Sequence, residues 1–249
     1  MNRPAFALAA ALALGATAAP AFDITAMTPP ESAAFGEAVR GYLMENPGVL
    51  MEVIAALEAQ QADAQAEGDS ALVLANAADI YEDGFSWVGG NPEGSLTVVE
   101  FIDYRCGYCR KAHSEVLDLV TSDGDIRYVV KEFPILGEES VIASRFAVSA
   151  LRVAGPEAYE AIHNGLYTDF RGAVTAERLA AFATDLGFDG AAIAAGMDAP
   201  EVAEVLNANH QLGQRLRIEG TPTFVMGDRM LRGYVPLEGM RAMVADLRG

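Results

Sequence analysis

The feature that most constrains the fold is a pair of cysteines placed where a strand gives way to a helix. Cys106 and Cys109 are the only cysteines in the 249-residue chain, and they lie in the stretch VVEFIDYRCGYCRKAH. Residues 96–104 are rich in β-branched and aromatic side chains and follow a Gly/Pro-rich turn, which predicts a buried strand. After the pair, apolar residues recur at helical spacing: Ala112, Val116, Leu117 and Val120. The sequence therefore predicts an α/β fold with the pair at a strand–helix junction.

The spacing of the two cysteines indicates redox chemistry. A disulfide that closes so short a loop adds little stability as a staple. Structural zinc usually takes four Cys or His ligands, and no second cysteine pair is present. Haem attachment needs a histidine directly after the second cysteine, where this chain has Arg110. These exclusions favour a redox pair that needs no metal and no cofactor.

A helix N-terminus beside Cys106 would change the chemistry of its thiol. The first N–H groups of a helix lack intrahelical partners, and the helix dipole favours negative charge there. The thiol pKa then falls from about 8.5 toward a range of about 3.5–7.5. Because the thiolate is the attacking species in thiol–disulfide exchange, we predict that Cys106 is the nucleophile and that Cys109 resolves the mixed disulfide.

A second motif lies near the C-terminus, in RIEGTPTFVMGDRMLRGYVP, residues 217–236. The letters TFVM predict a strand, GD a tight turn and MLRGYV a returning strand. Pro222 cannot donate a ladder hydrogen bond, so we expect it at the start of its strand.

The motifs VVEFIDYRCGYC and EGTPTF resemble the thioredoxin superfamily, and within it the DsbA-like exported thiol–disulfide oxidoreductases. The resemblance implies a thioredoxin fold and a cis Thr221–Pro222 bond that faces the cysteines. It also implies that four residues bind the client strand: Thr221, Pro222, Gly107 and Tyr108. The Gly-Tyr dipeptide and the Thr before the proline resemble the residues that the isomerase and reductase members of the family have at these positions, rather than those of the strong oxidases.

Four further ionisable residues lie near these motifs. Glu100 matches a family position for a buried acid that exchanges a proton with Cys109, although strand alternation alone equally allows a solvent-facing carboxylate. Lys131 and Glu132, in VVKEFP, are expected to be ordinary strand-end charges, and His113 a surface residue of its helix.

The chain divides into segments by composition. Residues 86–249 are predicted to form the DsbA-like thioredoxin domain, interrupted at about 138–214 by a helical insertion. Residues 22–85 are predicted to be a helical extension and linker, and YLMENPGVLMEVIAALE within them resembles the N-terminal segment of ScsC-type proteins. The apolar stripes of this extension must pack either on the chain's own domain or on further copies. We favour a homo-oligomer formed through residues 31–60.

The start of the chain is typical of a secretory signal peptide. Arg3 precedes an Ala/Leu-rich run that ends in small residues, so we expect cleavage near Ala21 and a periplasmic location. No later segment is apolar for long enough to span a bilayer, so no membrane insertion is expected after cleavage. The formal net charge of −18 disfavours nucleic acid as a partner.

These observations lead to an expected function and its rivals. We predict a disulfide isomerase or reductase that acts on misfolded exported proteins, and the resemblance implies a membrane disulfide reductase as its partner. A DsbA-type dithiol oxidase remains an alternative. A copper(I)-binding protein is another, because soft thiolates suit that ion. A chaperone that holds clients without redox chemistry is a third.

Overall fold

The computed structural model describes residues 24–249, so the predicted signal peptide, residues 1–21, lies outside the described part of the chain. The chain forms two compact units, Met1–Ala59 and Gln60–Gly249. Within residues 24–249, no helix is both long and apolar enough to cross a membrane.

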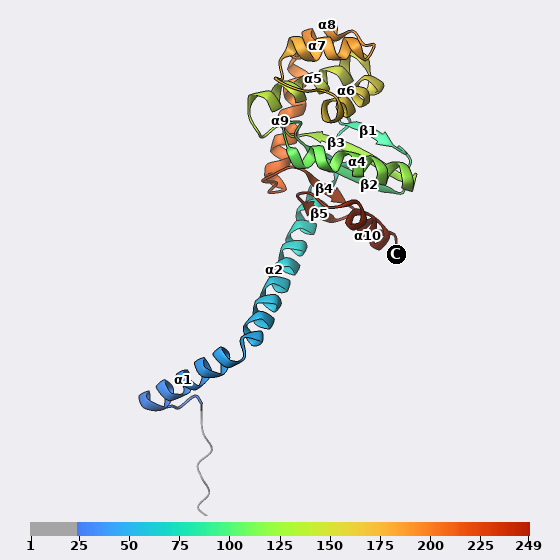
Figure 1. Ribbon diagram of the computed structural model, residues 1–249. Coiled ribbons are helices and arrows are strands. Elements are labelled where there is room, and N and C mark those ends of the chain that lie inside the picture. The colour runs from blue at the N-terminus through green and yellow to red at the C-terminus, as the bar shows by residue number, and fades with distance from the viewer. Residues whose placement is uncertain (1–23) are drawn as a thin grey trace, which may run out of the picture. The chain divides into compact units, whose positions relative to one another are not determined.

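The second unit contains a five-stranded sheet in the order β1-β3-β2-β4-β5 (Figure 1). Its strands are β1 (Trp87–Gly90), β2 (Leu96–Ile102), β3 (Ile126–Glu132), β4 (Thr223–Met226) and β5 (Arg229–Arg232). The central pair β2 and β3 is parallel, and every other pair is antiparallel. The two motifs predicted to form the site therefore meet in the sheet, because β2 precedes the cysteines and β4 follows Pro222.

Both faces of the central strands are covered. Side chains alternate between faces along a strand, and here each set enters a core. One core contains Val98, Ile102 and Tyr128 together with residues of α4, α6 and α10. The other contains Val99, Phe101 and Val129 with residues of α2, α3 and α9. This double burial explains why β2 and β3 are almost continuously apolar.

Helices surround this sheet and fill the connection from β3 to β4. The helices are α3 (Ala77–Tyr81), α4 (Gly107–Asp123), α5 (Glu138–Ala154), α6 (Pro156–Thr168), α7 (Ala176–Asp185), α8 (Gly190–Gly196), α9 (Pro200–Arg215) and α10 (Leu237–Arg248). Figure 1 shows α5 to α8 gathered beyond one end of the sheet. The predicted α/β fold with a helical insertion between β3 and β4 and with N-terminal helices is confirmed.

The strand prediction was incomplete at two points. It missed β1, a four-residue edge strand with the Gly-rich sequence WVGG, which pairs antiparallel with β3. The strand after it ends at Ile102 rather than at residue 104. The reason is Asp103, whose carboxylate accepts a hydrogen bond from the Arg105 N–H at 2.7 Å and turns the backbone.

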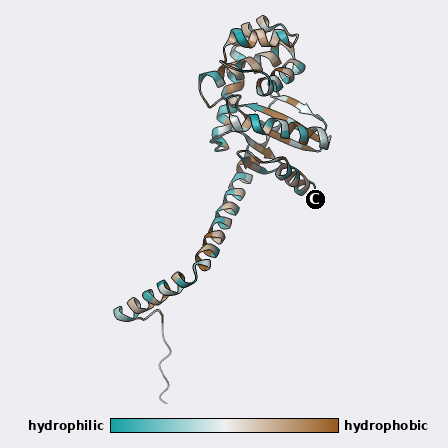
Figure 2. Ribbon diagram, in the orientation of Figure 1, coloured by the Kyte–Doolittle hydropathy of each residue, from teal (hydrophilic) through white to brown (hydrophobic). Residues whose placement is uncertain are grey.

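The first unit, in its described part, consists of α1 (Pro29–Glu45) and the start of α2 (Pro47–Ala75). The break falls at Asn46, whose side chain donates to the Tyr42 carbonyl at 2.9 Å. Within this unit α1 buries no residue. Nine large apolar side chains of these two helices are exposed: Phe35, Val39, Tyr42, Met44, Leu50, Met51, Val53, Ile54 and Leu57. Figure 2 shows apolar and polar residues interspersed along both helices.

Candidate active site

The cysteine pair lies at the junction between the end of β2 and the start of α4. Cys106 is the N-cap of α4, and the Cys109 backbone N–H donates to its sulfur at 3.4 Å. Both cysteines are largely buried, Cys106 at 7% exposed and Cys109 in the first turn at 1% exposed. Both cysteines are free thiols in this structure. The structure thus makes Cys106 the more accessible sulfur and covers Cys109.

The Thr-Pro motif faces this pair from the other half of the chain. The Thr221–Pro222 bond is cis, and the Cys106 sulfur lies 3.1 Å from the Thr221 carbonyl oxygen. The Gly233 N–H donates to the Pro222 carbonyl at 2.9 Å, which ties this loop to the residue after β5.

The Cys106 site stabilises a thiolate. The Cys109 thiol donates a hydrogen bond to the Cys106 sulfur, and this is the largest effect on the Cys106 pKa. Partial burial opposes it, but the Thr221 side chain and the N–H groups of Cys109 and Tyr108 reinforce it. Together they lower the pKa of Cys106 to about 5. At neutral pH the Cys106 sulfur is therefore ionised and able to act as a nucleophile.

The partner groups behind Cys106 stay protonated at neutral pH. Burial first, and then the hydrogen bond to Cys106, raises the pKa of the Cys109 thiol. Glu100 is 3% exposed, so it is not a solvent-facing carboxylate, and burial raises its pKa to about 8. The Tyr128 hydroxyl donates to it from the neighbouring strand. Glu100 also interacts electrostatically with both cysteines, so it belongs to the same buried site.

Asp103 organises the loop that carries Cys106, and sequence reasoning missed it. It is fully buried, and its carbonyl accepts the Cys106 N–H at 3.1 Å. Its carboxylate accepts the N–H groups of Ile135 and Leu136 at 2.8 and 3.0 Å. The signal available in the sequence was an acidic residue directly after an apolar strand and three residues before the nucleophile. Asp103 thus fixes the active-site loop to the loop after β3.

Two predicted strand-end charges are buried on opposite faces of β3, so that expectation was wrong. Lys131 is fully buried, pairs with the Asp83 carboxylate and donates to the Asp79 carbonyl at 2.7 Å. Glu132 is 2% exposed on the other face. Its carboxylate accepts three hydroxyl groups, from Tyr104 at 2.8 Å and from Tyr159 and Ser144 at 2.6 Å each. Burial raises the Glu132 pKa to about 7.

His113 was expected on the surface of its helix and is instead 5% exposed. The insertion covers it: its ring centroid lies 5.1 Å from that of His163 on α6. Burial, and then the charge of Arg110, lowers the His113 pKa to about 4. The imidazole is therefore neutral at pH 7 and packs as an aromatic ring behind the cysteines.

The remaining predicted site residues flank the nucleophile. Gly107 is the first residue of α4, and the Tyr108 side chain is 63% exposed. The Tyr108 ring stacks on Tyr234, with centroids 6.4 Å apart.

Within residues 24–249, no group of three or more Cys, His, Asp or Glu side chains is arranged to hold a metal ion.

Comparison with known proteins places this geometry in a family. The sequence pattern of the Thioredoxin family matches residues 82–246. The pattern of the copper resistance protein ScsC N-terminal domain matches residues 31–64. The sodium/proton antiporter NhaA of Herminiimonas arsenicoxydans is 31% identical over 171 residues, which cover 65% of this chain. Those residues cover 26% of the antiporter, so the chain spans about a quarter of the length of this curated relative.

Solved structures agree with the family pattern. A thioredoxin-like oxidoreductase from Silicibacter pomeroyi DSS-3 is 37% identical, with a TM-score of 0.64 over 69% of this chain and 96% of its own. ScsC of Proteus mirabilis in a transitional conformation is 25% identical, with a TM-score of 0.62 over 89% of this chain and 97% of its own. Since the family pattern spans more than half of the chain, including both cysteines and Pro222, the chain belongs to the thioredoxin family.

Proposed function

We propose that this protein is an exported thiol–disulfide oxidoreductase that works as a disulfide isomerase or reductase on misfolded proteins. The observation that carries the proposal is the Cys106 sulfur, which caps α4 and accepts the Cys109 N–H. A cysteine with a pKa of about 5 is ionised at neutral pH, as a nucleophile in disulfide exchange must be.

The first chemical step uses Cys106. Its thiolate attacks one sulfur of a client disulfide, forms a new S–S bond to it and displaces the other client sulfur as a thiolate. The backbone of Thr221 and the ring of Pro222 would hold the extended client segment beside Cys106. Gly107 and Tyr108 would contact the same segment from the α4 side.

The mixed disulfide can then be resolved by two reactions. In isomerisation, a client thiolate attacks the client sulfur bonded to Cys106, forms a new client disulfide and releases Cys106 as a thiolate. In reduction, Cys109 loses its proton and attacks the Cys106 sulfur, so that the client leaves reduced and the protein leaves oxidised. We assign the Cys109 proton to the ionised form of Glu100, whose pKa of about 8 suits proton transfer near neutral pH.

Isomerase or reductase activity is favoured over oxidase activity by the residues around the pair. Gly107-Tyr108 between the cysteines and Thr221 before the proline resemble the isomerase and reductase members of the family. Isomerisation also requires reduced cysteines, so a membrane disulfide reductase is the expected partner that returns Cys106 and Cys109 to the thiol state. The periplasmic location depends on the sequence pattern of residues 1–21.

The N-terminal helices support a homo-oligomer. In the first unit, nine large apolar side chains of residues 35–57 are 40–71% exposed. Apolar surface of this extent usually marks an interaction site, and a second copy of the chain offers a matching surface. The match of residues 31–64 to the ScsC N-terminal domain supports a dedicated module in this part of the chain. The division into residues 22–85, 86–249 and an insertion at about 138–214 stays a prediction.

Recovery of a scrambled ribonuclease tests the proposal. The reduced mature protein, added in catalytic amounts, is expected to restore ribonuclease activity, because Cys106 opens wrong disulfides and the client re-forms correct ones. The measurement is the rate of recovered ribonuclease activity with and without the protein. Rapid oxidation of a reduced client by the disulfide form, without any recovery of scrambled client, would instead indicate a dithiol oxidase.

A further inference from the structure

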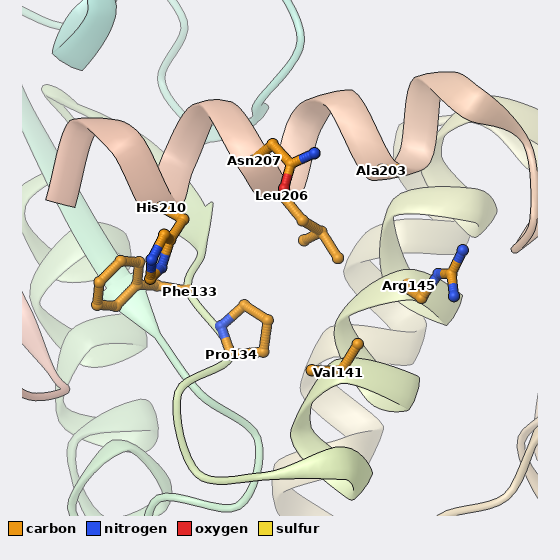
Figure 3. Close-up of a pocket in the computed structure, with 8 residues that line it drawn as sticks. All are labelled: Phe133, Pro134, Val141, Arg145, Ala203, Leu206, Asn207 and His210. Atoms are coloured by element: carbon orange, nitrogen blue, oxygen red, sulfur yellow. The ribbon is translucent and has the colours of Figure 1, made fainter. Parts of the chain in front are cut away.

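A groove lies outside the cysteine site, between α9, the start of α5 and the loop after β3. Its cavity volume is about 330 Å³. Figure 3 shows Pro134, Val141 and Leu206 around a common space, with Phe133 and His210 stacked at one end and Arg145 at the other. Val141 is 37% exposed, so an apolar side chain faces solvent at the mouth of the groove.

The floor of the groove is rigid. The Phe133 ring is 3% exposed and packs where Gly213 of α9 has no side chain, since a Cβ there would lie 2.4 Å from the ring. The same ring stacks on His210 with centroids 6.0 Å apart and meets Phe101 edge-on at 5.8 Å. A groove built on a packed core side chain is preformed, as small binding sites usually are.

The groove is continuous with the loop that carries the nucleophile. Asp103 holds both: its carbonyl accepts the Cys106 N–H, and its carboxylate accepts the N–H groups of Ile135 and Leu136, which directly follow Pro134 in the groove. Leu136 is 53% exposed and adds a further apolar side chain to the loop that contains Pro134. An extended polypeptide advances about 3.3 Å per residue, so a residue roughly three to six positions from a client cysteine lies about 10–20 Å from it along the client.

The charges of the groove also favour one class of occupant. Its ionisable lining residues are Arg145 and His210, and no carboxylate lines it although the chain has a formal net charge of −18. Arg145 pairs at 3.3 Å with Asp198, whose side chain is 92% exposed. Such an exposed ion pair contributes little free energy, so an acidic group of a client can replace Asp198 as the partner of Arg145. The groove thus accepts apolar side chains with an acidic neighbour.

We propose that this groove binds an extended apolar segment of a client polypeptide whose cysteine is bonded to Cys106. The inference rests on the proposed function, because it assigns a binding surface to the same exchange reaction. It gives the protein a preference for exposed apolar segments, which misfolded proteins present and folded proteins bury.

Two cysteine peptides joined by a disulfide to thionitrobenzoate test this, with the full reduced protein. One peptide carries Glu-Leu-Val-Leu three to six residues from the cysteine on each side, and the other carries Ser and Gly there. We expect the second-order rate constant for thionitrobenzoate release to be about tenfold higher for the apolar peptide, from burial of a few apolar side chains. The double variant Val141→Ser, Leu206→Ser should lose this preference. The matched control Val153→Ser, Leu186→Ser, with both sites exposed outside the groove, should keep it.

The outcomes separate the inference from the proposed function. Equal rates for both peptides with the unchanged protein, or an unchanged preference in the double variant, would overturn the groove assignment alone. A lower mass of the double variant by light scattering would assign the groove to a second copy and overturn it too. If no peptide and no small disulfide reacts, the proposed function fails as well. A variant that reacts with the small disulfide at the wild-type rate is folded. If the double variant does not react with it, the single variant Val141→Ser takes its place in the peptide comparison.

Discussion

Cys106→Ala is expected to abolish thiol–disulfide exchange, lowering the rate at least about a thousandfold, because no other sulfur can replace its thiolate. Cys109, the only other cysteine, is 1% exposed and has a raised pKa, so it is both covered and protonated. The measurement is the rate of reduction of a small chromogenic disulfide at neutral pH by the reduced protein.

Cys109→Ala is the matched control for that experiment. It should still attack the disulfide, because Cys106 keeps its N-cap position and the backbone N–H of residue 109, but its pKa should be higher, since the hydrogen bond from the Cys109 thiol is lost. Without a resolving thiol, the mixed disulfide with Cys106 should accumulate and be visible by mass spectrometry. Exchange by Cys106→Ala at the wild-type rate would contradict the assigned nucleophile. If the protein were instead a copper(I)-binding protein, the reduced wild type would bind copper(I) stoichiometrically and show no exchange activity. Cys106→Ala would then lose the copper binding.

The second large effect is expected from the triple variant Leu50→Gln, Ile54→Gln, Leu57→Gln. These side chains are 46–52% exposed on the first turns of α2, and their apolar surface is the proposed contact between copies. We expect the variant to be monomeric by light scattering. Recovery of scrambled ribonuclease should fall at least about tenfold, because several active sites around one client are lost, while reduction of a small disulfide stays unchanged.

Leu74→Gln is the control for the triple variant. Leu74 lies on the same helix and is 66% exposed, but it belongs to the second unit. It should leave both the mass and the ribonuclease recovery as they are. A triple variant that keeps the wild-type mass would show that residues 31–60 do not hold copies together. A monomeric triple variant that still restores ribonuclease activity at the wild-type rate would show that isomerisation does not require the oligomer.

The core of the site could be predicted because its geometry is local. Cys106 and Cys109 are three residues apart between an apolar run and a helical stripe, so strand, N-cap and first turn follow from neighbouring residues alone. Pro222 was identified with the same site only through resemblance, since no local rule brings residues 106 and 222 together. The pairing of β2 with β4 provides that contact in the structure.

The misjudged residues were those whose surroundings come from distant parts of the chain. Strand alternation left Glu100 undecided, and Lys131 and Glu132 were assigned to solvent. The sheet is in fact covered on both faces, so each of them is buried with partners from other elements. His113 lies beside the apolar stripe of α4, and α6 of the insertion packs against its ring. Burial by a helical block placed elsewhere in the sequence cannot be read from the spacing within one helix.

The titration of Cys106 is the measurement that tests the account most directly. Its pKa is lowered, so the thiolate should be present above pH about 5 and be lost as the pH falls through that value. The ultraviolet absorbance of the thiolate in the reduced protein should therefore show one step with a midpoint at pH about 5, absent in Cys106→Ala. Cys109 should add nothing near neutral pH, because its pKa is raised. A midpoint near the ordinary thiol value of about 8.5 would contradict a stabilised nucleophile at the start of α4.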